Sequence, residues 1–555
     1  MIKIIRVQKI FFFLLFFLPF YCQAQLSEKD RFAISKNLDI YNSVFKELNL
    51  YYVDSIEVEK TIRSNINYML RGLDPYTEYI PEEEMSNFLQ ETTGEYAGVG
   101  ALISSRADSN VVFVVDPYEG MPAQLAGLQA GDQLLEIDDV NLDGKNSTFA
   151  SEHLRGQPNT IVKIKYLRPG EKKPKTVSFE RKRIEIDPII YYGVLSDGIG
   201  YIYFNSFTTH SAENFRRALR DLVDNQQIKS LIIDVRNNGG GVLEDCVEIL
   251  NDFIPKGELL LTIKGKVPQM DRIYRTTKNA GEPTMPIVVL TNQNSASASE
   301  ILAGAIQDLD RGVVIGSRTY GKGLVQSPRE LPYNGRLKLT TGKYYIPSGR
   351  CIQAIDYAQR GEDGRVSYIP DSLTTTFYTR NGRPVKDGAG VLPDIQIEEK
   401  IIPNIVYYMD MQNIFFDFVV QWRIKHPKIA SPEKFILSDE TYDVFKEFVK
   451  SQNFIYDRQS EKVMENLKKI MEFEGYLDSA SDEFAALENK LKPNLDQDLE
   501  LHKDQLSYFL SLQIMKQYYF ARGEHIFLLR GDEIVEKAID VLSDSEQYKE
   551  ILSPR

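Results

Sequence analysis

A serine-rich turn between two apolar segments carries the residues best suited to do chemistry. The run Ser295-Ala296-Ser297-Ala298-Ser299 follows the apolar segment 287–290 and precedes apolar residues spaced as on one face of a helix. Lys322 lies 25 positions after Ser297, between two glycines. A serine on a strand-to-helix turn and a lysine on a glycine-flanked loop can act as nucleophile and general base.

These two residues also have ordinary structural interpretations. Ser297 and Glu300 have the spacing of a capping box, and a serine before an apolar helix is more often a cap than a nucleophile. A lysine between glycines is usually solvated, and Gly321-Lys322-Gly323 is too short to be a phosphate-binding loop. The pair alone therefore does not establish catalysis.

If the pair is catalytic, its chemistry makes a demand on the fold. A serine hydroxyl attacks only when a base removes its proton, and lysine is a base only when neutral. The lysine pKa must then fall from about 10.4 towards roughly 7–8 through burial. We therefore expect Lys322 to lie in a desolvated pocket beside Ser297 Oγ. The backbone N–H of Ala298, at the expected helix N-terminus, is a candidate donor to the oxyanion.

A Ser–His–Asp triad is the main alternative chemistry. The chain has five histidines, and only His210 lies near a strand end in the region that contains Ser297. His210 fits a surface loop better, because Lys322 already supplies a base. No cluster of histidine, cysteine or carboxylate residues has metal-ligand spacing, so we expect no metal and no other cofactor.

Length, charge and the first residues restrict the class of protein. A chain of 555 residues suggests roughly three or four domains, and a net charge of −13 argues against non-specific binding of nucleic acid or anionic lipid. Residues 1–24 have the basic, apolar and small-residue pattern of a secretory signal. We expect an exported, periplasmic protein, soluble after signal cleavage or membrane-associated if the segment is retained. Cys246 and Cys351 are too few for a disulfide framework, so we expect buried thiols.

The rest of the chain divides by hydrophobic period. Residues 25–91 are mainly helical and end in Leu73-Asp74-Pro75-Tyr76-Thr77-Glu78-Tyr79-Ile80, which we interpret as a helix terminus and a turn. Residues 92–183 are mainly strands. Residues 184–398 alternate strands and helices, which indicates a largely parallel, buried sheet, with an exposed loop or hairpin over about 359–388. Residues 399–555 are helical, and we expect a packing or interaction module.

A second candidate site lies at the start of the strand-rich segment. In Gly98-Val99-Gly100-Ala101 the glycines can expose consecutive backbone N–H groups, which bind a terminal carboxylate while the peptide adds a strand to the sheet edge. A glycine-rich hairpin without a ligand is the structural alternative.

Several of these motifs together resemble the carboxyl-terminal processing (tail-specific) serine protease family, with a PDZ domain. The run SASASE holds Ser297, a T-Y-G-K-G run holds Lys322, and Gln326 follows four positions later. The runs DVRNNGGG at 234–241 and LDPYTEYI at 73–80 also match family motifs. The resemblance covers about residues 30–400.

The resemblance implies a multidomain α+β architecture. Its parts are a helical N-terminal region (25–91), a PDZ domain (92–183), an α/β ClpP/crotonase-like protease core (184–398) and a helical C-terminal extension (399–555). It also implies that Gln326 orients Lys322 and that the N–H of Gly240 is the second oxyanion donor. Gly98, Val99, Gly100 and Ala101 would form the peptide-binding loop.

The expected function is that of a serine endopeptidase with a Ser–Lys dyad, which cleaves exported proteins at or near their C-termini. The PDZ domain would recognise substrate tails and gate the dyad. The helical ends would mediate homo-oligomerisation or an adaptor contact. A peptide-binding scaffold with a gated or silent protease core is the alternative from a different class.

Overall fold

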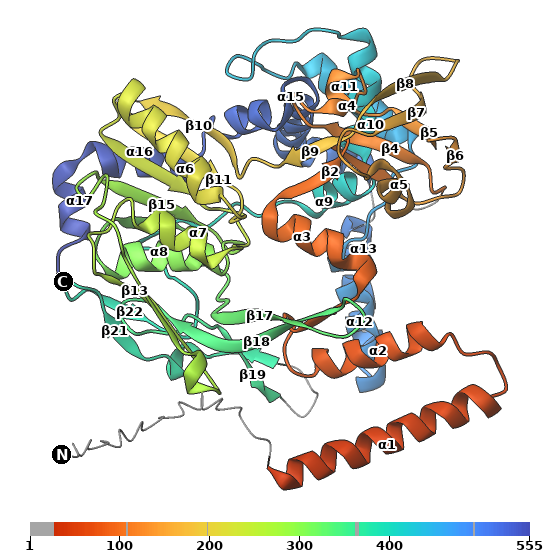
Figure 1. Ribbon diagram of the computed structural model, residues 1–555. Helices are drawn as coiled ribbons and strands as arrows, with labels where there is room; N and C mark the ends of the chain where they lie inside the picture. The colour runs from red at the N-terminus through yellow and green to blue at the C-terminus, as the bar shows by residue number, and fades with distance from the viewer. Residues whose placement is uncertain (1–26, 107–108, 197, 361–365, 492–493, 555) are drawn as a thin grey trace, which may run out of the picture.

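The computed structural model describes residues 27–106, 109–196, 198–360, 366–491 and 494–554 (Figure 1). The expected secretory signal, residues 1–24, lies outside these ranges. Within them, no helix has the length and apolar character that crossing a membrane requires.

A six-stranded sheet forms the core of residues 184–398, the expected protease domain. Its strands, in spatial order, are β10 (Ile189–Ser196), β11 (Ile199–Phe204), β12 (Ser230–Asp234), β15 (Ile287–Thr291), β16 (Val313–Gly316) and β23 (Ile395–Gln396). Only β10 runs antiparallel to its neighbour, and the other pairs of this sheet are parallel. Strands β12, β15 and β16 are buried at every position, as continuous apolar runs in parallel sheets are. The predicted α/β core is confirmed.

Helices from two distant parts of the chain cover this sheet. On one face lie α6 (Ser211–Arg220), α7 (Leu243–Leu250) and α8 (Ala298–Asp308). The other face packs against α16 (Glu533–Ser543), whose Ile534, Val535 and Val541 share a core with Ile232 and Val288 of the sheet. Helix α17 (Ser545–Ile551) follows along the same side (Figure 1). The last helices therefore complete the core of the protease domain.

A second sheet carries the strands that flank the candidate lysine. It contains β1 (Glu78–Ile80), β18 (Arg336–Tyr345), β13 (Leu259–Gly265) and β14 (Arg272–Arg275), and β17 (Leu324–Glu330) also pairs with β18. Strand β1 pairs antiparallel with β18, with Glu78 opposite Lys338. The LDPYTEYI run is thus more than the helix terminus and turn expected from its sequence, because its end adds a strand to the protease domain.

Residues 92–183, the expected PDZ domain, form a separate β-rich unit with its own core. Its main sheet contains β3 (Ala101–Ser105), β4 (Val112–Pro117), β5 (Gln133–Ile137), β6 (Val140–Asn141), β7 (Ile161–Leu167) and β8 (Lys175–Glu180). A two-stranded sheet of β2 (Glu95–Gly98) and β9 (Lys182–Glu185) lies where the domain begins and ends, with helices α4 (Pro122–Leu125) and α5 (Ser147–Leu154) beside the main sheet.

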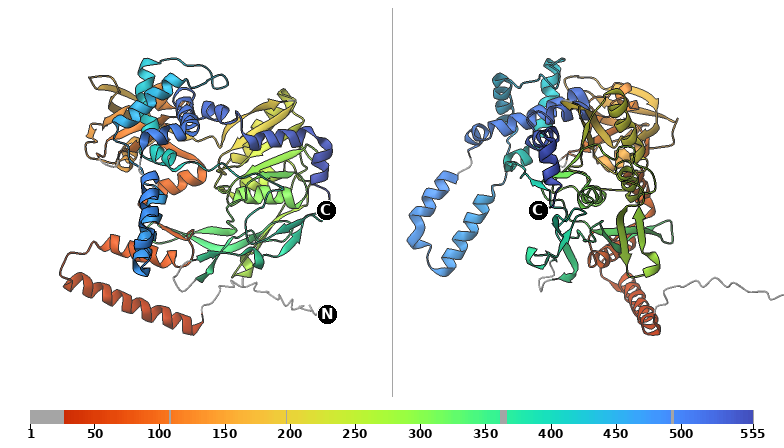
Figure 2. Two further views of the ribbon diagram at one scale, coloured as in Figure 1. Left: turned by 180° about the vertical axis from the view of Figure 1, so that it is seen from behind. Right: turned by 90° about the vertical axis from the view of Figure 1, so that its left-hand side faces the viewer.

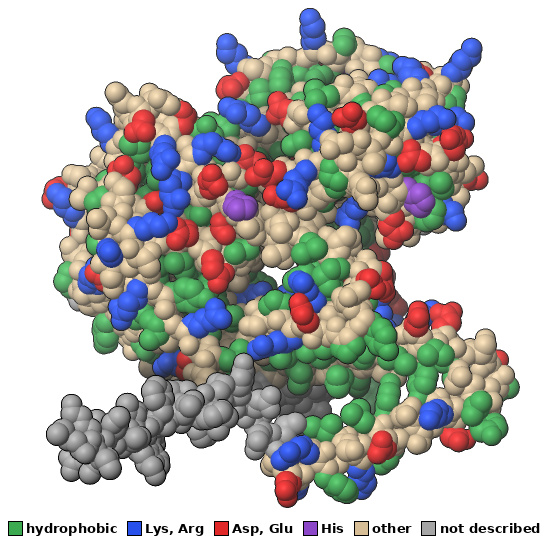
Figure 3. All heavy atoms as spheres, in the orientation of Figure 1, with side chains coloured by type: hydrophobic (Ala, Val, Ile, Leu, Met, Phe, Trp, Pro, Cys, Tyr) green, Lys and Arg blue, Asp and Glu red, His purple; other side chains and the backbone are tan. Residues whose placement is uncertain are grey.

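The N-terminal helices are α1 (Glu28–Tyr51), α2 (Val58–Arg71) and α3 (Met85–Thr93). No residue of α1 is buried, and Figures 1 and 2 show this helix standing away from the body. In Figure 3, hydrophobic side chains are visible along the arm that α1 and α2 form.

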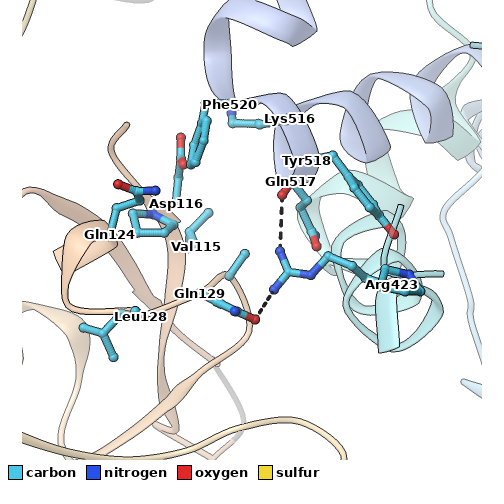
Figure 4. A pocket seen from close by; sticks show the side chains of 14 residues that line it. Val115, Asp116, Gln124, Leu128, Gln129, Arg423, Lys516, Gln517, Tyr518 and Phe520 are labelled. Atoms are coloured by element: carbon cyan, nitrogen blue, oxygen red, sulfur yellow. Dashed lines mark hydrogen bonds between the residues drawn. The ribbon is translucent and has the colours of Figure 1, made fainter. Parts of the chain in front are cut away.

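The C-terminal extension is helical, as predicted, and it contacts the PDZ domain. Its first helices are α9 (Asn404–Met411), α10 (Ile414–Lys425), α11 (Asp439–Ser451), α12 (Gln459–Glu474), α13 (Ser481–Leu491), α14 (Leu495–Leu501) and α15 (Lys503–Leu528). Phe416 packs on Phe113 with ring centroids 5.3 Å apart, and Arg106 pairs with Asp417 at 2.6 Å. A pocket of about 390 Å³ lies between the two domains, where Arg423 donates to Gln129 (Figure 4).

The region about 359–388 forms paired strands. Strand β19 (Ile355–Arg360) pairs with β20 (Val366–Tyr368), and β21 (Thr376–Tyr378) pairs with β22 (Pro384–Lys386) as a hairpin. Arg383, beside this hairpin, is buried and pairs with Asp310 and Asp394. These ion pairs attach the insertion to the protease core.

Candidate active site

Ser297 lies at the turn between β15 and α8, as its sequence context predicts. It is the N-cap residue of α8, with φ 57° and ψ −115°. A positive φ is strained for a residue other than glycine, and such strain persists only where the surroundings impose it. The turn thus presents Ser297 at the junction of a buried strand and a buried helix.

The structure distinguishes Ser297 from the serines on either side of it. Ser295 and Ser299 are fully buried, and their hydroxyls donate to the backbone oxygens of Val235 and Asn238, each at 2.8 Å. Ser297 is the one of the three that is not buried. The neighbouring serines therefore build the turn, and Ser297 is the one available to a substrate.

Glu300 connects this turn to the lysine loop. Its fully buried carboxylate accepts hydrogen bonds from the amides of Ser297 (2.9 Å), Lys322 (2.8 Å) and Gly321 (2.7 Å), and from Thr319 Oγ1 (2.6 Å). The capping box thus forms, but the same carboxylate also holds the loop of Lys322. Burial raises the pKa of Glu300 to about 7, although the four donors favour the charged form.

Tyr344 of β18 forms a second connection between the two loops. Its hydroxyl donates to the backbone oxygen of Ser297 at 3.2 Å and to that of Lys322. Tyr344 is itself buried. The backbones of the two candidate residues are therefore fixed to one another from two sides.

The surroundings of Lys322 lower its pKa. Burial is the largest effect and lowers its pKa, and the nearby cation of Lys338 lowers it further. The carboxylates of Glu300, Glu78 and Asp74 act in the opposite direction. The net pKa of Lys322 lies below its ordinary value, in the direction expected for a base.

The Lys322 ammonium lies over an aromatic ring. Its Nζ is 4.5 Å from the ring centroid of Tyr76, which belongs to the LDPYTEYI run. Among the hydrogen bonds between described residues, none joins Ser297 Oγ to Lys322 Nζ. The predicted dyad contact therefore stays a prediction. Sequence reasoning missed Tyr76, because nothing in the run itself indicates that it reaches Lys322, 246 residues further along the chain.

Gln326 lies on β17, near Lys322 in the chain. Its amide nitrogen donates to Leu324 O and Thr340 Oγ1, both at 3.3 Å. Neither bond reaches Lys322, so the orienting role remains a proposal.

Gly240 packs directly against the turn that contains Ser297. A Cβ atom on it would lie 2.7 Å from Ser297 Cβ and 2.9 Å from Ala298 N, and its φ is +94°. Only glycine fits this position. The Gly240 N–H donates to Asn238 Oδ1 at 2.8 Å. The two predicted oxyanion donors, Gly240 and Ala298, are thus neighbours. The N–H of Gly240 already donates to the side chain of Asn238.

The loop that carries Gly240 begins at a buried ion pair. Arg236 makes a two-nitrogen contact with Asp234, whose carboxylate also accepts from Tyr201 Oη at 2.7 Å. Asp532 of the C-terminal extension pairs with the same guanidinium at 2.8 Å. His525 stacks on Tyr203 with ring centroids 4.2 Å apart, and burial lowers its pKa to about 4. These extension residues could not be anticipated from sequence, because they belong to no motif.

The glycine-rich PDZ loop connects β2 to β3. Val99 O and Gly100 O accept from Ala123 N (2.8 Å) and Tyr118 N (3.0 Å), which fix the loop, and Gly100 has φ +72°. The ring of Tyr96 lies against Gly98, where a Cβ would be 2.8 Å from its Cε2. These contacts fix the loop, and the binding of a peptide carboxylate by its N–H groups stays a proposal.

Two alternatives from the sequence can be placed in the structure. His210 is exposed and begins α6 with φ 72°, and no hydrogen bond between described residues joins it to Ser297. Over the described ranges, no group of three or more potential metal ligands is present. Cys246 is buried, Cys351 is partly buried, and both thiols are free.

Three segments of the chain match known protein families. Residues 198–359 match peptidase family S41, residues 94–168 match a PDZ domain, and residues 405–542 match the "probable PDZ-protease, C-terminal helical domain". The last match covers most of the extension whose helices contact both other domains.

Carboxy-terminal processing proteases from other organisms are similar to this chain over more than half of its length. A carboxy-terminal-processing protease of Bartonella bacilliformis is 34% identical over 325 residues, which cover 58% of this chain and 73% of that protein. A carboxyl-terminal-processing protease of Synechocystis sp. is 32% identical over 331 residues, 58% of this chain and 76% of that protein. Among solved structures, a photosystem II D1 C-terminal processing protease is 25% identical in sequence, with a TM-score of 0.35. The match covers 65% of this chain and 87% of that protein's chain.

The fold and these similarities define a serine-type peptidase with a PDZ domain and a helical C-terminal domain. The chain belongs to the carboxy-terminal processing protease family, within peptidase family S41.

Proposed function

We propose that this peptidase uses Ser297 as its nucleophile and Lys322 as its general base. The observation that carries the proposal is the Glu300 carboxylate, which accepts from the amides of both residues at 2.9 and 2.8 Å. The lowered pKa of Lys322 supports the same assignment, because a lysine must lose its proton before it can accept one.

In the proposed reaction, Lys322 Nζ takes the proton of Ser297 Oγ as the oxygen attacks the peptide carbonyl. The oxyanion accepts hydrogen bonds from the N–H groups of Ala298 and Gly240. For this, the Gly240 N–H must release Asn238 Oδ1 and donate to the substrate oxygen instead. The lysine then returns the proton to the leaving amine, and water hydrolyses the acyl-enzyme. Gln326 would orient Lys322 after its own side-chain amide has released Leu324 O and Thr340 Oγ1.

We propose that the substrates are exported proteins cut at or near their C-termini. The loop Gly98–Ala101 would bind the terminal carboxylate, and the tail would add a strand beside β3. The names of the relatives, which are carboxy-terminal processing proteases, support this substrate class. The basic and apolar start of the sequence supports an exported, periplasmic location.

A gated version of this function is favoured by one observation. The N–H of Gly240, a proposed oxyanion donor, already donates to Asn238 Oδ1 at 2.8 Å, and no hydrogen bond among the described residues joins Lys322 to Ser297. Gating predicts that a competing peptide with a free C-terminus slows cleavage of a tailed protein more than cleavage of a short peptide. The same peptide with an amidated C-terminus is the control, and equal slowing of both substrates would argue against gating.

The helical arm offers a surface for self-association or for an adaptor. Val44, Leu48 and Tyr51 lie on one face of α1 and are 52%, 41% and 76% exposed, although they are largely apolar. We propose that a second copy of the chain or an adaptor covers this face. Sedimentation of the chain with and without residues 27–55 tests the homo-oligomer.

The experiment that tests the catalytic assignment is cleavage of unfolded casein by residues 25–555. We expect cleavage by the wild type and a loss of at least about a thousandfold in Ser297→Ala and Lys322→Ala. Cleavage that survives in both variants would refute the dyad. Cleavage that survives Lys322→Ala but is lost in His210→Ala would restore the histidine alternative.

A further inference from the structure

Tyr76 reaches the candidate base from a distant part of the chain. Its ring centroid lies 4.5 Å from Lys322 Nζ. This distance is within the range of roughly 6 Å over which the negative face of an aromatic ring attracts a cation. Tyr76 belongs to the segment between α2 and β1, whereas Lys322 follows β16.

The position of Tyr76 is fixed by its neighbours. The buried carboxylate of Asp74 accepts from Tyr76 N and Thr77 N, both at 2.8 Å, and from Thr77 Oγ1 at 2.9 Å. Thr77 Oγ1 in turn accepts from Thr340 N of β18 at 3.2 Å. The segment is therefore attached to the strand that also carries Tyr344.

The ring itself is supported by a second tyrosine. Tyr76 and Tyr357 meet edge to face, with centroids 6.0 Å apart and an interplanar angle of 89°, and their hydroxyls are 3.4 Å apart. This arrangement orients the face of the Tyr76 ring towards Lys322. The contact therefore results from a built site and not from a mobile surface side chain.

An aromatic ring at this place has two effects on a lysine base. It excludes water, which favours the neutral amine, and its π face attracts the ammonium. A base needs both properties, because it must start neutral and then become charged. As proton transfer proceeds, the positive charge develops directly under the ring, where little water is present to solvate it.

We propose that Tyr76 is a positioning residue of the active centre, whose ring holds Lys322 Nζ and stabilises the ammonium formed when the lysine takes the proton of Ser297. The Oγ–H bond breaks, an N–H bond forms on Nζ, and the oxygen electron pair attacks the peptide carbonyl. The inference rests on the proposed role of Lys322 as base.

Other charged groups also face Lys322 and must stay constant in a test. They are Lys338 on β18, Glu300 on α8, Glu78 on β1, and Asp74 in the segment before β1. Three more tyrosine hydroxyls are nearby, those of Tyr320, Tyr344 and Tyr357. Substitution of Tyr76 alone leaves all of these groups in place.

The test compares Tyr76→Leu with Tyr76→Phe in the full chain. Leucine retains an apolar side chain but removes the π face, whereas phenylalanine retains the ring and loses only the hydroxyl. On the high-pH plateau we expect kcat of Tyr76→Leu to fall about tenfold, and that of Tyr76→Phe to stay within about twofold of wild type. The KM of a short peptide should be unchanged in both.

A second readout does not depend on turnover. In a Ser297→Ala background, the chain is labelled with 13C at lysine Cε, and the Lys322 signal is assigned by its loss in Lys322→Arg. We expect its titration midpoint to lie at lower pH in Tyr76→Leu than in Tyr76→Phe, because the ammonium loses the ring. Thermal unfolding of both variants checks that the fold is retained.

The outcomes separate this inference from the proposed function. Equal midpoints in the two variants would overturn the inference, and so would an equal kcat. A lower midpoint together with a lower kcat in Tyr76→Leu would support it. Failure of the dyad itself would appear independently, as casein cleavage that survives Ser297→Ala and Lys322→Ala.

Discussion

Arg236 Nη2 lies 2.8 Å from Asp532 Oδ2, although 296 residues separate the two in the chain. Arg236 precedes the loop that presents Gly240 to the nucleophile turn, and Asp532 is the N-cap residue of α16. This ion pair joins the C-terminal extension to the loop proposed to bind the oxyanion.

The first prediction concerns this ion pair. Asp532→Asn keeps the cap, since asparagine also accepts from the amides of Ile534 and Val535, but it removes the charge that faces Arg236. We expect a loss of about 1–3 kcal/mol in the free energy of unfolding and a lower kcat with little change in KM.

The matched control for that variant is Asp544→Asn. Asp544 caps α17 in the same way, through the amides of Glu546 and Gln547, but it is exposed and pairs with no arginine among the described residues. Its substitution should change the free energy of unfolding by less than about 1 kcal/mol. Equal losses in the two variants would show that the ion pair with Arg236 adds nothing beyond the negative charge at a helix N-terminus.

The second prediction concerns the glycine beside the nucleophile. Gly240→Ala would place a Cβ 2.6 Å from Ala296 O and 2.7 Å from Ser297 Cβ, at a φ that alanine rarely adopts. We expect kcat to fall about 10²- to 10³-fold, the scale of losing one oxyanion donor. Gly239→Ala is the control, because a Cβ there meets nothing within 4 Å. A similar loss in both variants would contradict a specific role for Gly240.

The third prediction is a shift in the pH profile. Lys338 repels the Lys322 ammonium and so lowers the pKa of Lys322. Lys338→Gln removes that repulsion, the pKa of Lys322 rises, and the acid limb of kcat/KM should move to higher pH. Lys343→Gln, an exposed residue on the same strand, should leave the limb in place. An unmoved limb in Lys338→Gln would argue that another group sets the profile.

The fourth prediction follows from the raised pKa of Glu300. Its folded value of about 7 exceeds the ordinary 4.5, so the folded state holds this proton more tightly than the unfolded state does. The contribution of Glu300 to stability is therefore complete below pH 4.5 and is lost as pH rises through about 7. The free energy of unfolding of the wild type, relative to Glu300→Gln, should fall by up to about 3 kcal/mol between these limits.

Denaturant unfolding at pH 5 and pH 8 measures this difference. Glu330→Gln, on the exposed end of β17, serves as the control and should follow the pH dependence of the wild type. If Glu300→Gln and Glu330→Gln behave alike, the buried carboxylate does not titrate in this range.

Hydrophobic period was sufficient to predict the parallel sheet of the core and the helical ends, whereas the PDZ domain and the class of the core were expected from the family resemblance. Continuous apolar runs such as 287–290 specify buried parallel strands, and the strand–turn–helix context of Ser297 followed from them. The period carries no information about side chains that meet across the fold. Tyr76 over Lys322 and Asp532 on Arg236 arise from strand pairing and helix packing between distant segments, and no spacing in the chain encodes them. Strand β1 was missed because three residues are too few to show an alternating pattern.

The packing of α16 on the protease sheet has a consequence for synthesis. Until residues 533–543 leave the ribosome, helix α16 cannot cover its face of that sheet. This face includes Ile232, Val288 and Leu290. The guanidinium of Arg236 also lacks one of its carboxylate partners at that stage. A growing chain thus carries Ser297 and Lys322, the proposed nucleophile and base, before the helix that completes this core has been synthesised.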